Sequence, residues 1–205
     1  MGMLLLFVLA GLAGLGAGML RGGRPGTLLA AKVHARTLAL VLLALQALVG
    51  SLALRSIGIP RGVGPVLLFV ALTGLLAVAR ANGQLPGVPL LALGLLANLL
   101  VLVLNFGVPV QVETLTRAGI AVEQPVPHRP DAKHVIDGPG TRLAVLGDQF
   151  AVRPLHAVIS FGDVAEMAGL FLLVQALVLG SRGAGDDSAH GAPKARTVPW
   201  STWAD

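Results

Sequence analysis

Five apolar runs, separated by polar segments, dominate the chain. A helix needs about 20 predominantly apolar residues to cross the hydrocarbon core of a bilayer, with about 17 as the practical lower end. Three of the runs reach that length, and the other two reach it when flanking uncharged residues are counted. The pattern predicts about five transmembrane helices, near residues 3–20, 37–54, 65–80, 87–105 and 163–181.

We therefore expect an all-α integral membrane protein whose membrane domain covers residues 1–181. One long connection, residues 106–162, joins the fourth and fifth helices, and we expect it to be ordered and extracytoplasmic. Residues 182–205 change abruptly to Gly, Ser, Asp, Pro and His. Low hydrophobicity without an apolar face is typical of a flexible tail, and we expect this tail in the cytoplasm.

The composition supports a membrane environment and excludes several other classes of protein. Hydrophobic residues make up 55% of the chain and charged residues 12%, whereas soluble domains carry about 25% charged residues. The chain has no cysteine, which excludes disulfides and thiolate metal sites. The net charge of +5 forms no basic stripe with interleaved aromatic residues, so we expect no nucleic-acid partner.

The positive residues predict the orientation in the membrane. No charged side chain precedes Arg21, and four cationic residues follow the first run directly: Arg21, Arg24, Lys32 and Arg36. Because cytoplasmic loops carry an excess of Lys and Arg, the N-terminus is predicted outside and the C-terminus inside. The first run lacks the preceding positive charge of a signal peptide, so we interpret it as an uncleaved anchor.

Small residues mark a possible packing face on the first helix. Ala10, Gly14 and Gly18 recur every four residues, a spacing that lets two helix backbones approach closely inside lipid. The alternative is simple compositional bias, because the chain contains 27 glycines.

Few polar side chains interrupt the predicted spans. Asn98 and Asn105 are seven residues apart, so they lie on one face of the fourth helix. We interpret them as hydrogen-bonding links between helices, with a substrate path as the alternative. We expect no ionisable residue at mid-depth, because the nearest acids, Asp163 and Glu166, lie at the outer end of the fifth helix.

The long connection holds the candidate chemistry. His128, Asp131 and His134 form a His-x-x-Asp-x-x-His pattern, but this spacing aligns metal ligands only on a helix, and two nearby prolines oppose one. We therefore predict neither a metal site nor a cofactor. Arg142 and Asp148 flank a short apolar run, and they could pair with one another or with a phosphate-bearing lipid.

The start of the fifth helix carries a capping signal. Ser160 and Asp163 fit a Ser-x-x-acid capping box, which explains the acid structurally. Five side chains remain candidates for pinning the connection or holding a ligand: Asn98, Asn105, Arg142, Asp148 and Asp163.

Several short elements occur in a distinctive order. Asn105-Phe-Gly-Val-Pro-Val110 is followed by Lys133-His-Val135, by Leu146-Gly-Asp148 and by Ser160-Phe-Gly-Asp-Val164. This order resembles an uncharacterised family of small bacterial polytopic membrane proteins, a domain of unknown function. The chain departs from the pattern at Phe106, where Gly is preferred, and at Val108, where Met is usual. The resemblance implies about five membrane helices in a bacterial plasma membrane, and it implies no activity.

Three functions are compatible with these features. The first is an accessory or structural subunit of a larger membrane assembly, with membrane lipids and other integral membrane proteins as partners. The second is an enzyme that acts at the outer interface on a lipid or lipid-linked substrate through His134, Arg142 and Asp148. A small-solute transporter is the least favoured, because the chain has no evident inverted repeat and no mid-membrane charge.

Overall fold

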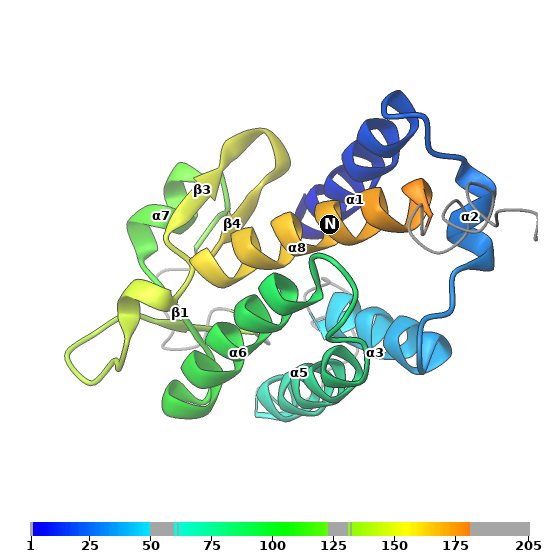
Figure 1. The fold of residues 1–205 in the computed structure, drawn as a ribbon. Helices are drawn as coiled ribbons and strands as arrows, with labels where there is room; N and C mark the ends of the chain where they lie inside the picture. The colour runs from blue at the N-terminus through cyan, green and yellow to red at the C-terminus, as the bar shows by residue number, and fades with distance from the viewer. Residues whose placement is uncertain (1, 50–59, 61, 123–130, 132, 181–205) are drawn as a thin grey trace, which may run out of the picture.

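The computed structural model describes residues 2–49, 60, 62–122, 131 and 133–180 (Figure 1). Within these residues, four helices are long and apolar enough to cross a membrane: α1 (Gly2–Leu20), α5 (Val63–Ala81), α6 (Val88–Asn105) and α8 (Phe161–Leu179). The prediction of a mainly helical protein with several membrane-spanning helices is confirmed at this level. The second predicted span begins as α3 (Arg36–Val49), which has 14 residues, and residues 50–54 lie outside the described part of the chain.

The helices pack in an order that differs from their order in the sequence. The neighbours are α3 and α5, α5 and α6, and α6 and α8, while α1 packs along α8 (Figure 1). At one end, Gly2 lies beside Leu155 of the long connection. At the other end, the Arg24 N–H donates a hydrogen bond of 3.0 Å to the Val178 carbonyl, next to the short helix α2 (Pro25–Ala30). The first and last helices therefore run parallel.

Strands make the long connection more complex than the all-α prediction. It contains β1 (Val108–Val110), α7 (Val112–Arg117), β2 (His134–Ile136), the 3-10 turn η1 (Ala144–Leu146), β3 (Phe150–Val152), the 3-10 turn η2 (Arg153–Leu155) and β4 (Ala157–Ile159). β1 pairs in parallel with β2, and β3 pairs antiparallel with β4. The all-α prediction is wrong for this segment, because three-residue strands are too short to display a period of two in the sequence.

Helix α6 ends on a residue in the left-handed conformation. Phe106 has a φ of 51°, in the left-handed region, and its N–H donates to the Leu102 carbonyl. Helices commonly end on a glycine in this conformation, because other residues pay about 1–2 kcal/mol for it. The chain therefore holds Phe106 in a conformation that favours glycine, at some cost in stability.

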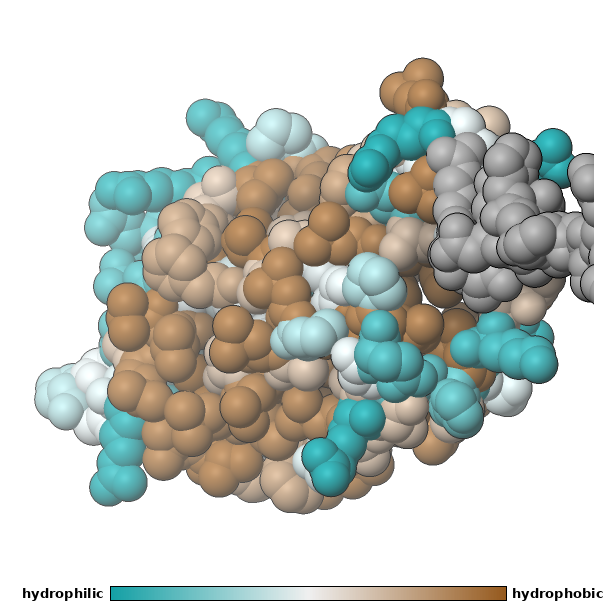
Figure 2. All heavy atoms as spheres, in the orientation of Figure 1, coloured by the Kyte–Doolittle hydropathy of each residue, from teal (hydrophilic) through white to brown (hydrophobic). Residues whose placement is uncertain are grey.

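An apolar surface surrounds the helices. Leu and Val side chains of α1, α3, α5 and α6 are among the large hydrophobic residues that are exposed. Figure 2 shows this apolar surface across the middle of one face, with polar residues towards its edges. Water-soluble monomers rarely expose so large a contiguous apolar patch, so the surface agrees with a membrane protein.

Two glycines of α1 lie at its contact with α8. Gly14 and Gly18 are buried, and Ala10 on the same face is partly buried. A Cβ added to Gly14 would overlap the Phe171 carbonyl, and one added to Gly18 would lie 2.9 Å from the Val178 Cβ. The two helix backbones are therefore close because these positions lack side chains.

Gly14→Ala should destabilise the protein, because its methyl group would meet backbone, which cannot rotate away. We expect a loss of about 1–3 kcal/mol, as for other overpacked sites, measured by thermal unfolding in detergent micelles. Gly16→Ala is the matched control, since a Cβ there meets nothing within 4 Å. Equal unfolding temperatures for the two variants would contradict the close contact of α1 with α8.

Candidate functional site

Strand β1 brings distant parts of the connection together. On one side Val108 pairs with His134 of β2, and on the other the Asp148 N–H donates a hydrogen bond of 2.8 Å to the Pro109 carbonyl. A Cβ on Gly147 would overlap that same carbonyl, so only glycine allows the chain to approach β1 here. The basic residues before and in β2 therefore meet the carboxylate of Asp148.

Four charged side chains form an ionic cluster at this point. The Lys133 Nζ lies 3.0 Å from the Asp148 Oδ2, and the His134 Nε2 lies 2.8 Å from the same oxygen. The His134 Nδ1 lies 2.6 Å from the Asp131 Oδ2. Asp148 is fully buried, and a buried carboxylate needs a cation beside it to offset the loss of its hydration.

His134 is held as an imidazolium. Both of its ring nitrogens face carboxylate oxygens, which accept hydrogen bonds, so both nitrogens must carry a proton. Burial lowers the pKa of His134, but the charge of Asp131 and the hydrogen bonds to Asp131 and Asp148 outweigh it and raise the pKa to about 9. The ring is therefore a fixed cation near neutral pH.

The pKa values of the two acids are lowered and that of Lys133 is raised. Burial opposes the charge of each group, yet Lys133 and His134 hold the pKa of Asp148 below its usual value. Burial raises the pKa of Asp131, but the charge of His134 and its hydrogen bonds to Asp131 lower it by more. Burial lowers the pKa of Lys133, but nearby carboxylates raise it by more, and Asp148 has the largest effect among them. The four groups stabilise one another's charged forms.

A second polar network links α6 to α8 below the cluster. The Asn98 Nδ2 donates to the Asp163 Oδ1 at 3.0 Å and to the Glu166 Oε1 at 2.8 Å. The Ser160 hydroxyl donates to the Asn98 Oδ1 at 2.9 Å. The predicted capping box of Ser160 and Asp163 is confirmed, but Asp163 does more than cap α8, because it also bonds to α6.

This network lies within the predicted spans. Asn98 is seven residues from the end of α6, which corresponds to about 10 Å along the helix axis. Asp163 and Glu166 are buried, with 1% and 3% of their surface exposed. Both acids lie in the first two turns of α8, at the helix end where they were expected, and there they are buried inside the helix bundle.

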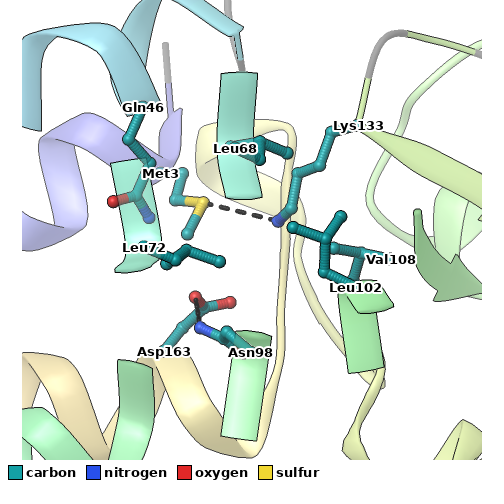
Figure 3. A pocket seen from close by; sticks show the side chains of 9 residues that line it. All are labelled: Met3, Gln46, Leu68, Leu72, Asn98, Leu102, Val108, Lys133 and Asp163. Carbon is teal, nitrogen blue, oxygen red and sulfur yellow. Dashed lines mark hydrogen bonds between the residues drawn. The ribbon is translucent and has the colours of Figure 1, made fainter. Parts of the chain in front are cut away.

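A small cavity separates the cluster from the network. Its volume is about 20 Å³, and its lining includes Met3, Gln46, Lys133, Asn98 and Asp163. Figure 3 shows the Lys133 amine directed at the Met3 sulfur, with Asp163 and Asn98 on the far side of the cavity. Such a volume accommodates about one water molecule, so it is too small for a substrate.

Arg142 does not join this arrangement. Its N–H donates to the Asn105 Oδ1 at 2.8 Å, and its carbonyl accepts from the Asn105 Nδ2 at 2.9 Å. Its side chain is exposed. Of the two alternatives named for Arg142 and Asp148, their pairing with one another is not found among the described residues, where Asp148 pairs with Lys133 and His134.

Asp131 and His134 of the His-x-x-Asp-x-x-His pattern belong to the ionic cluster. Asp131 accepts from the backbone N–H of His134 at 2.7 Å as well as from its ring, while His128 lies outside the described residues. Among the residues that the structure describes, no group of three or more His, Cys, Asp or Glu side chains is placed to hold a metal ion.

Sequence reasoning missed the two residues that complete the site. The sequence places Lys133 in the Lys-His-Val element but gives no indication of the acid with which it pairs. Glu166 was noted only as a helix-end acid. The signal for Lys133 would have been the pairing of β1 with β2, which places it beside Val108 at the end of α6. The signal for Glu166 would have been its spacing of three residues from Asp163, which puts both acids on one face of α8.

Comparison with known proteins assigns a family but no activity. A family model described as a family of unknown function, DUF5317, matches residues 30–175. This range contains Asn98 and the whole long connection, while α1 precedes it. No curated protein and no solved structure matches the chain.

Asp148→Asn should destabilise the protein strongly, because it leaves two buried cations without their shared carboxylate. Removing one partner of a buried ion pair costs about 3–5 kcal/mol, measured as the free energy of unfolding in micelles. Asp137→Asn, at a partly exposed acid in the same connection, should change it by less than about 0.5 kcal/mol. Similar losses in both variants would exclude a special role for Asp148.

Stability should also fall as the pH rises. The pKa of His134 is about 9 in the folded state against 6.5 for an unperturbed histidine, so its contribution to stability is complete below pH 6.5 and is lost as the pH rises through 9. We expect the wild-type unfolding temperature to decrease across that window. His134→Gln should lack this decrease, and an identical pH profile for both proteins would show that His134 is not the titrating group.

Proposed function

The chain belongs to the DUF5317 family of unknown function, and from that premise we propose that it is an accessory or structural subunit of a larger membrane assembly. The observation that carries the proposal is the closure of the polar site. Its charged groups bond to one another, and the cavity beside them, at about 20 Å³, has no room for a substrate.

The ionic cluster serves to fix the long connection on the helices. Lys133 extends from the connection to the lining of the helix-bundle cavity, whereas Asp148 is tied to β1 by its backbone. Buried ion pairs add little net stability compared with apolar packing, but they can specify one arrangement. A connection held in this way offers a preformed surface on one side of the membrane, which suits docking of a partner.

Helix α1 offers a second surface for a partner inside the membrane. Only 11% of its residues are buried, against 28% or more in the other three candidate spans. Its packing on α8 leaves Leu5, Leu9 and Leu12 exposed. We propose that another integral membrane protein contacts this face, in addition to membrane lipids.

The proposed orientation is N-out and C-in, in a bacterial plasma membrane. Arg24 lies beside the end of α8, and the backbone of His34 bonds to Asn82 at the turn between α5 and α6. Arg21, Lys32, Arg36 and Arg80 are close in sequence to these contacts, so the basic residues gather at the end opposite the long connection. The excess of positive charge supports a cytoplasmic location for that end.

An enzyme acting at the outer interface has less support. His134 and Asp148 do lie together, but both are occupied by the ionic cluster, and Arg142 is held apart by Asn105. A transporter would need a substrate path through the helices, and the cavity described above is too small to begin one.

Photo-cross-linking can test the accessory role. A photoreactive residue at Leu9, which is 49% exposed on α1, should cross-link to another membrane protein in native membranes. The same residue at Val70, which is 50% exposed on α5, should give mainly lipid adducts. A single 20.9 kDa chain in mild detergent, with no protein adduct from either position, would rule out the proposal.

A further inference from the structure

We propose that the groove between α6 and α8 binds an acyl chain of an anionic phospholipid, and that Arg142 holds the phosphate of the same lipid. This site lies on the outer side of the contact between the two helices and is separate from the ionic cluster. It goes beyond the proposed accessory function, because a lipid could bind here whether or not the protein has a partner.

The groove has the size and lining that a hydrocarbon chain needs. Its volume is about 400 Å³, within the range of about 300–1,000 Å³ for ligand pockets. The side chains that line it are apolar, and the larger ones are Leu93, Leu96, Leu100, Leu146 and Phe161. Several of these are half-exposed, so in a bilayer the groove opens to the lipid.

Small residues create the hollow. Gly94, Ala97, Gly162 and Ala165 lie in the groove between the larger side chains. A Cβ on Gly94 would overlap the Gly162 carbonyl and would lie 2.7 Å from the Glu166 Cγ. The floor of the groove is therefore the close crossing of α6 and α8, with the Asn98 network directly behind it.

The connection closes the groove at one end. Leu146 of η1 and Phe161 at the start of α8 line it there, and Phe161 packs edge-to-face on Phe150 with ring centroids 4.8 Å apart. Leu143 and Val145 of the same segment are exposed. Exposed apolar side chains beside polar ones can enter the boundary between headgroups and acyl chains, next to the lipid phosphates.

Arg142 supplies the charge at this level. The backbone N–H and carbonyl of Arg142 both bond to Asn105 at the end of α6. These bonds fix the backbone of Arg142 beside α6, and Leu146 of the groove follows four residues later in the chain. The exposed guanidinium of Arg142 pairs with no acid among the residues that the structure describes. A guanidinium binds phosphate through two parallel hydrogen bonds, which gives the site its preference for an anionic headgroup.

The charge of Arg142 can be tested by lipid titration of the full-length protein in micelles, followed by native mass spectrometry. We expect tighter binding of phosphatidylglycerol than of phosphatidylcholine, and about a tenfold loss for phosphatidylglycerol in Arg142→Gln, as for a charged hydrogen bond. Arg153→Gln, at another exposed arginine of the connection, is the matched control. Equal losses in both variants would overturn the role of Arg142.

Binding of the acyl chain in the groove is tested with a second variant. Ala97→Phe should fill it and abolish binding of phosphatidylglycerol, while Ala77→Phe, on the exposed surface of α5, should bind as the wild type does. Unchanged binding by a folded Ala97→Phe protein would overturn the site. Excess inorganic phosphate should compete poorly, and full displacement by it would show that a free phosphate, not a lipid, is the ligand.

Discussion

The constraint on which the structure depends is the cost of burying a charge inside the protein without a partner. Asp148 is fully buried, so it must be paired, and Lys133 and His134 supply the pairing. To do so, the connection must place β1 between β2 and the Gly147-Asp148 turn. The fold of the connection and its position on the helices thus follow from one carboxylate.

The same constraint orders the helices below. Asn98 donates to two acids of α8, which ties α6 to α8 where glycines already allow close approach. The inner side of this contact is polar and closed, and its outer side is the apolar groove. One helix pair therefore separates two environments, a bonded interior that fixes the fold and a lipid-facing hollow that is open to a ligand.

The short sequence elements that occur in a distinctive order meet at this place. The Asn105–Val110 element ends α6 and forms β1, Lys133-His-Val enters β2, and Leu146-Gly-Asp148 supplies the shared carboxylate. Ser160 and Asp163 begin α8 and bond to Asn98. Each of these elements sets a backbone contact or a buried polar bond.

The sequence by itself determined the apolar helices and the capping box of α8, because these depend on local length and spacing. It also indicated the small-residue face of α1, but not the glycines at which α6 and α8 approach each other. It could not place Lys133 against Asp148, since their contact passes through the parallel pairing of two three-residue strands far apart in the chain. For the same reason it left Arg142 with two alternatives, Asp148 or a lipid phosphate, because Arg142 and Asp148 flank one apolar run. Only the tertiary structure decided which cation Asp148 binds, because burial and strand pairing, not distance along the chain, set the cost of leaving it unpaired.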